Sequence, residues 1–452
     1  MIPSFTSETL LKRTRTRCPI CRDECPGEVW KVGEAKKQRV FLRRRCATHG
    51  ESETCIASDA RFYWLAQGDP QNACCGGDAC PAGDGAVRGT LGRNAAPAEA
   101  AGKVEELSTC LALIEIVNSC NLACPTCFAD SPRDSHVDAV PLPELQARIQ
   151  GVIDRKGGIE ILQLSGGEPT LHPQFAELLA WCHGNPGIDY VLLNTNGVRL
   201  AQDDAFLDEL ARTFRYGKFQ LYLQFDGPGE AGQRALRGAD LREIRRRAIE
   251  RCGTLNIPIT LAMTVTAENL AQVWEAVTFG LTYAHIRGVA FQPMFATGRA
   301  PSIPTRLNTA DIILSAVEQA GGRLRFEDFT PLPCGDPNCA TIGYLLRTPD
   351  GGTRSISEFI DFAQVQGFLR DKIRYRLEDL LQCGCENEPL GALLKEFELD
   401  ERHTFRLFIK PFMDIGTWDE DRIDRCCTHV IRPDGKLDSF CRYYAAGGAA
   451  AR

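Results

Sequence analysis

Short apolar segments alternate with longer amphipathic segments through the middle of the chain, from about residue 108 to about residue 330. The apolar runs have the length of buried strands, and the segments between them have the spacing of helices with one apolar face. The predicted strands are Leu111–Val117, Ile159–Leu164, Tyr190–Asn194, Gln220–Phe225, Pro258–Val265 and Val289–Pro293. The predicted helices are Leu142–Arg155, Gln174–His183, Ala205–Phe214, Leu241–Arg251 and Asn269–Tyr283. This pattern predicts an α/β fold with a parallel sheet and outer helices, arranged as a partial (β/α)6 barrel.

The two flanking regions contain few long periodic segments and carry most of the cysteines. We therefore expect three domains. Residues 1–105 form a cysteine-rich metal-binding domain of the ribbon type, and residues 106–330 form the barrel. Residues 331–452 form a second cysteine-rich domain, whose cysteines, described below, are expected to bind an auxiliary iron–sulfur cluster. The basic run Lys12–Arg17 is interpreted as a solvated approach to the first metal site.

Composition narrows the class of protein. The net charge of −7 over 452 residues does not indicate a nucleic-acid partner. The chain has no apolar run of about 18 residues or more, and its first residues do not resemble a secretory signal. We expect a cytoplasmic protein without a membrane span. In a large chain of this kind, 21 cysteines indicate metal centres in a reducing compartment rather than disulfides.

The sequence Cys120-Asn-Leu-Ala-Cys124-Pro-Thr-Cys127, called the triplet below, follows the first predicted strand directly. Each iron of a [4Fe–4S] cube needs one ligand from outside the cube. Three cysteines at this spacing can hold three irons and leave the fourth open for another molecule. The triplet therefore predicts an iron–sulfur cluster with one open iron.

A second metal site is predicted near the N-terminus. Cys18-Pro-Ile-Cys21 contains one pair of possible ligands. A second pair, in Cys46-Ala-Thr-His49, follows after two strand-like pieces. Two such knuckles on a small β-hairpin are typical of a tetrahedral mononuclear site with sulfur and nitrogen ligands. Zinc is the usual ion, and iron would also fit. Scattered free cysteines are the alternative interpretation, and Cys25 and Cys55 are reserve ligands.

The other cysteines suggest two further four-cysteine sites. The first would combine cysteines from a loop-like stretch with one that precedes the first barrel strand, namely Cys74, Cys75, Cys80 and Cys110. The second would combine cysteines around a turn at Pro433–Gly435 with an earlier pair, namely Cys334, Cys339, Cys427 and Cys441. The cysteines outside these sites are Cys182 and Cys252, which suit a helical core, and Cys383, Cys385 and Cys426. Cys383 and Cys385 could replace members of either set.

Glycines and polar residues follow the carboxyl ends of three predicted strands, which is where ligands bind in barrels and doubly wound sheets. The candidate cofactor-binding residues are Gly166, Gly167, Glu168, Pro169, Asn194, Asn196, Gln224 and Asp226. Glycines at a strand end let the backbone approach a ligand closely. Gln224 and Asp226 lie on one face of a strand, where they could reach ribose hydroxyls or simply cap the strand end.

Together the triplet and the Gly166-Gly167-Glu168-Pro169 turn resemble the radical SAM superfamily. The ribbon-like start and the tail, Lys410-Pro-Phe-Met-Asp414 to Phe440-Cys441, resemble the group that contains archaeal tetraether-lipid synthase and the methanogen pterin methylase. The resemblance implies S-adenosylmethionine at the open iron, with its amino group at the glycine turn. It also implies two auxiliary [4Fe–4S] clusters, one mononuclear zinc or iron, and an electron donor such as flavodoxin or ferredoxin. Cys74-Cys75-Gly-Gly-Asp-Ala-Cys80 stands where the group has a compact cysteine triplet, which leaves the ligands of the N-terminal auxiliary cluster open.

The resemblance implies a radical SAM enzyme that cleaves S-adenosylmethionine reductively to a 5′-deoxyadenosyl radical. The radical would abstract hydrogen for carbon–carbon bond formation, by methylation or alkyl coupling, on a small molecule or a lipid. A peptide-modifying maturase with auxiliary clusters is the alternative enzyme, and an iron–sulfur or zinc interaction protein is the non-enzymatic one. No Ser/His/Asp set or carboxylate pair stands out, so no protein side chain is predicted to be catalytic.

Overall fold

The structure is a computed structural model that describes residues 7–34, 37–65, 107, 109–133, 136–300, 302–332, 335–348, 352–358 and 403–445. Several cysteines with a predicted role lie outside these residues, namely Cys74, Cys75, Cys80, Cys334, Cys383 and Cys385.

The N-terminal region is an antiparallel sheet of four strands in sequence order: β1 (Ser7–Arg17), β2 (Glu24–Glu34), β3 (Lys37–Cys46) and β4 (Gly50–Ala57). Its small core consists of Val29, Val40, Leu42 and Ala57. The interpretation of Lys12–Arg17 as a solvated approach holds for Arg13 and Arg15, whose side chains are exposed, and fails for Thr16, which is completely buried in β1. Alternation along the strand explains the error, since one face of β1 packs against the rest of the protein.

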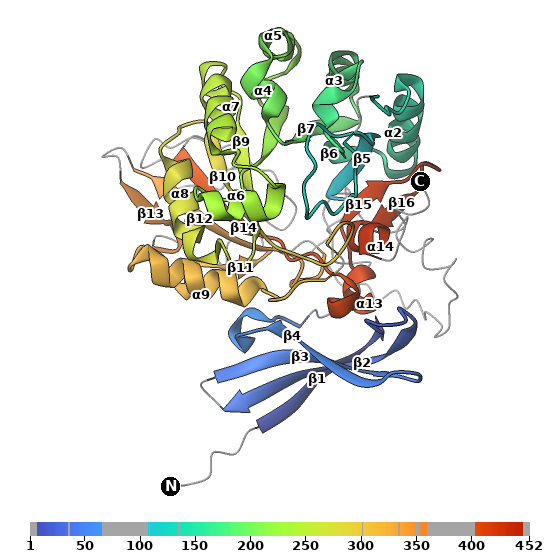
Figure 1. Cartoon of the computed structure of the whole chain (residues 1–452), viewed down its shortest axis with the longest axis vertical. Helices are drawn as coiled ribbons and strands as arrows, with labels where there is room; N and C mark the ends of the chain where they lie inside the picture. The colour runs from blue at the N-terminus through green and yellow to red at the C-terminus, as the bar shows by residue number, and fades with distance from the viewer. Residues whose placement is uncertain are drawn as a thin grey trace, which may run out of the picture.

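The central region has the predicted alternation of strand and helix (Figure 1). Its elements are β5 (Leu111–Val117), α2 (Leu142–Lys156), β6 (Ile159–Gly166), α3 (Phe175–Gly184), β7 (Ile188–Thr195), α4 (Val198–Gln202), α5 (Asp204–Thr213), β8 (Phe219–Gln224), α6 (Glu230–Arg237), α7 (Arg242–Thr254), β9 (Ile259–Val265), α8 (Val273–Leu281), β10 (Ile286–Pro293) and α9 (Thr309–Ala320). Strands β5 to β10 are parallel and adjacent in sequence order. The partial barrel is therefore confirmed.

Strands from the C-terminal region extend this sheet at both edges. At one edge β14 (Thr404–Ile409) pairs in parallel with β10, and β12 (Thr341–Arg347) pairs with β14. At the other edge β15 (Thr428–Ile431) pairs in parallel with β5, and β16 (Leu437–Ser439) pairs with β15. The short strands β11 (Thr330–Pro331) and β13 (Thr353–Ser355) pair with β12. The described strands of the C-terminal region thus extend the barrel sheet rather than forming a separate sheet.

The barrel core lies between the sheet and its helices. Apolar residues of the strands that face outward, such as Ile114, Leu162 and Leu221, pack with helix residues such as Ile149 and Leu179. Residues at alternate positions face inward, so Gln220, Tyr222 and Gln224 of β8 line the barrel interior. Polar side chains within a mostly apolar interior are unusual for a packed barrel, and here they line a cavity with room for a ligand.

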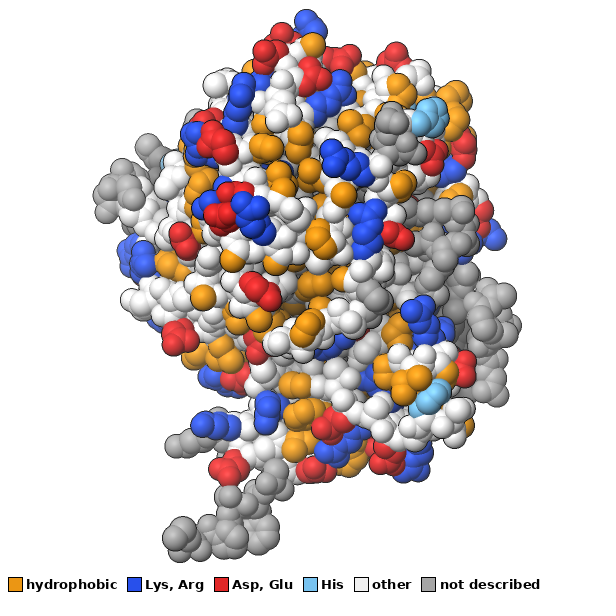
Figure 2. Space-filling view, viewed as in Figure 1, with side chains coloured by type: hydrophobic (Ala, Val, Ile, Leu, Met, Phe, Trp, Pro, Cys, Tyr) orange, Lys and Arg blue, Asp and Glu red, His pale blue; other side chains and the backbone are white. Residues whose placement is uncertain are grey.

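The N-terminal sheet packs against the short helix α13 (Glu420–Ile423) and the turn before it (Figure 1). The Lys12 ammonium lies 2.7 Å from Asp419 and 2.9 Å from Asp421, and the Thr16 hydroxyl donates to the Trp418 carbonyl at 2.6 Å. The space-filling view, from the same side as Figure 1, shows side chains of both charge signs interspersed over the visible face of the molecule (Figure 2). Within the described residues, every helix is too short or too polar to cross a bilayer.

Candidate metal centres and active-site cavity

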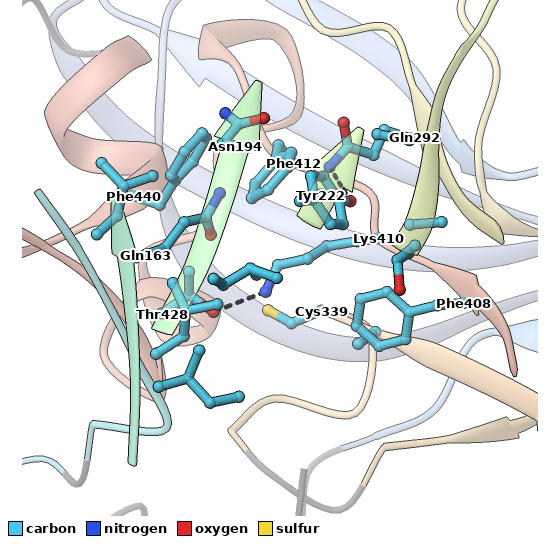
Figure 3. Close-up of a pocket in the computed structure, with 18 of the residues that line it drawn as sticks. Gln163, Asn194, Tyr222, Gln292, Cys339, Phe408, Lys410, Phe412, Thr428 and Phe440 are labelled. Atoms are coloured by element: carbon cyan, nitrogen blue, oxygen red, sulfur yellow. Dashed lines mark hydrogen bonds between the residues drawn. The ribbon is translucent and has the colours of Figure 1, made fainter. Parts of the chain in front are cut away.

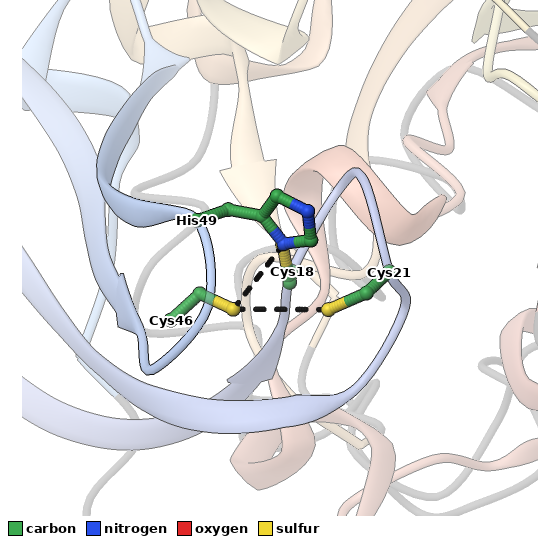
Figure 4. Close-up of side chains that lie close together, drawn as sticks. All are labelled: Cys18, Cys21, Cys46 and His49. Atoms are coloured by element: carbon green, nitrogen blue, oxygen red, sulfur yellow. Dashed lines mark hydrogen bonds between the residues drawn. The ribbon is translucent and has the colours of Figure 1, made fainter.

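The four predicted N-terminal ligands converge at one end of the small sheet (Figure 4). Their ligand atoms all lie within 4.8 Å of one another, and His49 Nδ1 lies 3.6 Å from Cys18 Sγ and 3.7 Å from Cys46 Sγ. Backbone N–H groups of His49 and Thr48 donate to Cys46 and lower the pKa of its thiol to about 6. The set of three thiols and one imidazole fits a tetrahedral zinc or iron ion. Cys25 is buried beside this set, at the opposite end of the β1–β2 connection from Cys18.

The triplet forms the loop that follows β5. Burial raises the pKa of Cys120 to about 12 and raises that of Cys124, and the negative charge of Cys127 adds to both shifts. Among the described residues, only the N-terminal set brings three or more such side chains close enough to share one ion. The three triplet thiols lie near enough for their charges to interact, and they do not form such a mononuclear set. Three cysteines in one loop fit a cluster in which each thiolate binds a different iron.

The glycine turn holds the chain just before the triplet. The Gly167 N–H donates to the Val117 carbonyl at 2.8 Å, and the Glu168 N–H donates to the Ser119 carbonyl at 3.0 Å. A Cβ atom at Gly166 or Gly167 would lie 2.2 or 2.1 Å from those same carbonyl oxygens, so no side chain fits at either position. The sequence requires two glycines here because backbone packs on backbone.

Glu168 connects the turn to the end of β7. Its fully buried carboxylate accepts from the Thr195 hydroxyl and the Asn196 N–H, both at 2.7 Å, and from the Thr170 hydroxyl at 2.7 Å. Burial raises the pKa of Glu168 despite these donors. Asn196 in turn donates to the Asn121 side chain at 2.6 Å and lies 3.9 Å from Cys120 Sγ. Glu168 and Asn196 thus position the triplet, and Pro169 is buried at the start of a short 3-10 helix.

The two candidates at the end of β8 each contact a buried arginine. The Gln224 side-chain oxygen accepts from Arg245 at 2.7 Å, and Gln224 also lines the barrel interior. The Asp226 carboxylate accepts from Arg237 at 2.6 and 2.7 Å and is fully buried. In this structure Asp226 therefore faces a guanidinium. Asn194 lines the interior and donates to Ser165 at 3.1 Å.

Three C-terminal cysteines gather beside the barrel interior. Burial raises the pKa of Cys426 to about 12 and of Cys441 to about 11, and the negative charge of Cys339 contributes to both. Arg422 lies against this group, with one guanidinium nitrogen 3.6 Å from Cys339 Sγ. Cys427 lines the same cavity, and its backbone carbonyl accepts from the N–H of buried Cys110 at 3.0 Å. The structure thus adds Cys426 to the predicted set.

One cavity connects the triplet side of the barrel with these cysteines (Figure 3). It measures about 340 Å³ and extends through the barrel interior. Its polar lining includes Gln163, Asn194, Gln220, Tyr222, Gln224 and Gln292, and its aromatic lining includes Phe128, Phe295, Phe412 and Phe440. The Phe412 and Phe440 rings are stacked with centroids 4.1 Å apart. Lys410 also lines this cavity, and its ammonium donates to the Thr428 hydroxyl at 2.6 Å.

Arginines are the functional candidates that sequence reasoning mostly missed. Arg299 donates to the Cys124 carbonyl at 3.2 Å and to Asp130 at 2.9 Å, and its N–H donates to the Cys127 carbonyl, so it braces the triplet loop. Arg237 and Arg422 each contact a cysteine from a distant segment. An arginine carries no sequence signal for such a role, because its partners come from other parts of the fold.

Family comparisons agree with these sites. Residues 114–280 match the radical SAM superfamily, and residues 10–58 match the family described as the HMPTM N-terminal zinc ribbon domain. The chain thus carries a radical SAM domain preceded by a zinc ribbon, and it is an enzyme of the radical SAM class. The predicted resemblance, the barrel and the ribbon are confirmed.

Three curated relatives show how far the similarity extends. The chain is 26% identical over 492 residues to 7,8-dihydro-6-hydroxymethylpterin dimethyltransferase of Methanocaldococcus jannaschii, covering 96% of this chain and 93% of the relative. It is 29% identical over 203 residues to the mycofactocin maturase MftC of Mycobacterium tuberculosis, covering 44% and 48%. It is 37% identical over 99 residues to GTP 3′,8-cyclase of Chlorobaculum tepidum, covering 22% and 28%. The chain thus spans nearly all of the first relative and less than half of the other two.

Proposed function

We propose that this radical SAM enzyme forms a carbon–carbon bond by methylating a small heteroaromatic molecule of the pterin class. The cavity carries this proposal. Its about 340 Å³ suits one small molecule, and amide side chains line it at several heights along the strands. Coupling of lipid chains would instead need a long apolar tunnel.

The chemistry of the lining matches a flat, polar ring system. Amide groups such as those of Gln163, Asn194 and Gln292 each offer both a donor and an acceptor, which ring nitrogens and carbonyl groups require. Phe412 and Phe440 offer aromatic faces on the same cavity. The relative aligned over nearly the whole chain is named for methylation of a pterin, which supports the same substrate class.

The triplet would hold the cluster that starts the reaction. When bound there, a [4Fe–4S] cluster supplies the electron that cleaves S-adenosylmethionine to methionine and a 5′-deoxyadenosyl radical, which abstracts hydrogen from the substrate. The glycine turn offers backbone carbonyls to the methionine amino group, while Asn194 and Gln224 face the cavity at the neighbouring strand ends. These residues are only half-buried, so a bound substrate and S-adenosylmethionine would themselves complete the exclusion of water from the reacting groups.

The C-terminal cysteines would hold an auxiliary [4Fe–4S] cluster on the far side of the cavity. Cys339, Cys426 and Cys441 supply three ligands, and Cys427 or Cys334 would supply the fourth. Lys410 and Arg422 offset the negative charge of this thiolate group. Cys110 is disulfide-bonded in this structure, which contradicts both its predicted role as a cluster ligand and the expectation that the cysteines form no disulfides. An N-terminal auxiliary cluster on the cysteines outside the described residues stays part of the proposal, as does an external electron donor such as flavodoxin or ferredoxin.

The test is anaerobic reconstitution of the full chain with iron and sulfide, followed by reduction with S-adenosylmethionine and a hydroxymethyl-dihydropterin. The mixture also contains a one-carbon donor, either further S-adenosylmethionine or a reduced pterin-type one-carbon carrier, because the cleaved S-adenosylmethionine keeps its methyl group in methionine. We expect 5′-deoxyadenosine to form and the pterin to gain the mass of one or more methyl groups, which the donor loses. With a pterin deuterated at the reacting carbon, we expect deuterium in 5′-deoxyadenosine, because the radical takes hydrogen from that carbon.

Parallel reactions with a phospholipid mixture and with a short peptide test the alternatives. Turnover of either one in preference to the pterin would contradict the proposed substrate class, and peptide turnover would favour the maturase interpretation. Absence of 5′-deoxyadenosine in a chain with a loaded triplet cluster would contradict the initiating chemistry itself.

A further inference from the structure

The carboxyl end of α6 touches the triplet loop at three successive residues. The Thr126 hydroxyl donates to the Leu236 carbonyl at 2.9 Å. Burial raises the pKa of the Cys124 thiol, and the next residue, Arg237, carries its guanidinium close enough for its positive charge to oppose this rise. After it, Gly238 lies against Pro125, where an added Cβ would be 3.5 Å from the proline ring. The helix end therefore fixes the position of Arg237 relative to Cys124.

Asp226 holds the same guanidinium from the opposite side. Arg237 Nε and Nη2 donate to the two Asp226 oxygens at 2.6 and 2.7 Å, and Nη2 also lies 3.2 Å from the Thr264 hydroxyl. The Asp226 side chain is fully buried and that of Arg237 is 9% exposed. A bidentate pair at this depth has a single geometry, so Asp226 fixes the guanidinium of Arg237 beside the triplet loop.

The backbone at Asp226 is bent to make this pair. Its φ of 61° lies in the left-handed region, which is costly for a residue with a side chain. Three contacts hold it there: the Thr264 N–H donates to the Asp226 carboxylate at 3.2 Å, Asn269 donates to the Asp226 carbonyl at 3.1 Å, and Gln233 donates to the Gly227 carbonyl at 3.1 Å. Strain that the surroundings enforce in this way is typical of functional positions.

We propose that Arg237 is a positioning residue that, with Asp226, sets the reduction potential of the cluster at the triplet. This rests on the cluster proposed above. A hydrogen bond donated to a ligand sulfur, and a positive charge beside it, stabilise the more negative reduced cluster. Asp226 opposes this effect and limits it. The Arg237 charge acts on Cys124 more strongly than the Asp226 charge does, so the cation outweighs the carboxylate.

The two residues should therefore shift the potential in opposite directions. Arg237→Gln removes the charged donor and leaves the buried carboxylate near the cluster, so we expect a more negative midpoint potential. Asp226→Asn leaves the cation uncompensated, so we expect a more positive one. Arg237→Lys keeps the charge but replaces the planar fork by one ammonium, so we expect a smaller negative shift.

The measurement is an anaerobic redox titration of the reconstituted full chain without S-adenosylmethionine, followed by electron paramagnetic resonance of the reduced cluster. Adding S-adenosylmethionine afterwards identifies the signal of the triplet cluster, because only the cluster with an open iron changes. The matched control is Arg234→Gln, one turn earlier on α6, where an exposed arginine pairs with Glu230. We expect no shift in this control.

Equal midpoint potentials in the wild type and Arg237→Gln, at full iron content, would overturn the inference. Shifts of the same sign in Arg237→Gln and Asp226→Asn would also overturn it, because they would report a shared structural disturbance. Weaker S-adenosylmethionine binding with an unchanged potential would instead make Arg237 a contact of that molecule. If Arg237→Gln does not fold, Arg237→Lys and Asp226→Asn still test whether the midpoint potential shifts in opposite directions. A wild-type chain without the responsive signal would overturn the cluster proposal itself.

Discussion

The ribbon site and the triplet are both built from cysteines with short spacings, but their surroundings differ. The four ribbon ligands come from residues 18 to 49 and lie within 4.8 Å of one another at the end of a small sheet. The triplet ligands lie within eight residues of sequence, yet Asn196, Arg237 and Arg299 from three later segments contact the triplet loop.

The difference shows what each site requires of the fold. A structural metal needs only four ligands in the right geometry, and a local hairpin supplies them. A cluster that passes an electron also needs a controlled environment around its sulfurs, which only distant segments can supply. The ribbon therefore depends on its own residues, whereas the triplet depends on the whole barrel.

Loss of a triplet ligand should have the largest effect on chemistry. Cys124→Ala removes a proposed iron ligand that lies beside Arg237, and we expect 5′-deoxyadenosine formation to fall below detection. The ribbon should keep its metal, because its ligands are separate. Iron, zinc and product measurements check this. The matched control is Cys182→Ala, a fully buried cysteine in α3, which should retain activity.

Loss of a ribbon ligand should have the reverse pattern. We expect Cys46→Ala to lose the mononuclear metal and to destabilise the N-terminal sheet by several kcal/mol, because metal binding contributes directly to folding in such sites. Hydrogen exchange of β2 and β3 should increase at least tenfold while the triplet cluster still loads. Cys55→Ala in β4 is the control, since its thiol lies outside the ligand set. Simultaneous loss of both metals would show that the two sites are coupled.

Removal of the Arg299 brace should have an intermediate effect. Arg299→Ala deletes hydrogen bonds to the Cys124 carbonyl and to Asp130, each worth about 1–3 kcal/mol when a charged donor is involved. We expect several-fold faster release of iron to a chelator, with little change at the ribbon. Arg323→Ala, which removes a contact to the Ala320 carbonyl, should release iron at the wild-type rate. Equal rates of iron release in the wild type, Arg299→Ala and Arg323→Ala would show that the triplet loop keeps its conformation without Arg299.

Acid should weaken the barrel through a buried histidine, with the smallest effect. Burial in α3, with nearby Arg215 and Lys218, lowers the pKa of His183 to about 4. Below the unfolded pKa of about 6.5, the unfolded chain gains a proton that the folded chain does not. The contribution of His183 to the free energy of unfolding is therefore fully present above about pH 6.5. It falls by about 2 kcal/mol as the pH drops toward 4, allowing for solvent screening.

Chemical denaturation at pH 7 and pH 5 tests this expectation. His183→Gln should reduce the loss of stability between the two values, whereas His136→Gln, at an exposed position, should keep the wild-type loss. An unchanged loss in His183→Gln would assign the acid sensitivity to other groups.

Local patterns in the sequence are sufficient for the parts of the protein that depend on local contacts. The six strands and their helices follow from apolar periodicity, and β5 begins and ends at the predicted residues. The ribbon set Cys18, Cys21, Cys46 and His49 follows from its two knuckles. The triplet and the two glycines follow from spacing and from the close approach of two backbones.

Only the tertiary structure decided which distant segments meet. Pairing of β14 with β10 and of β15 with β5 brings Cys339, Cys426 and Cys441 to the same cavity as Gln224, although the sequence separates them by more than 100 residues. It also places Arg237 against Cys124 and turns Asp226 toward that arginine. Side-chain type alone does not specify such partners, because they depend on strand order and on which residues face into the barrel.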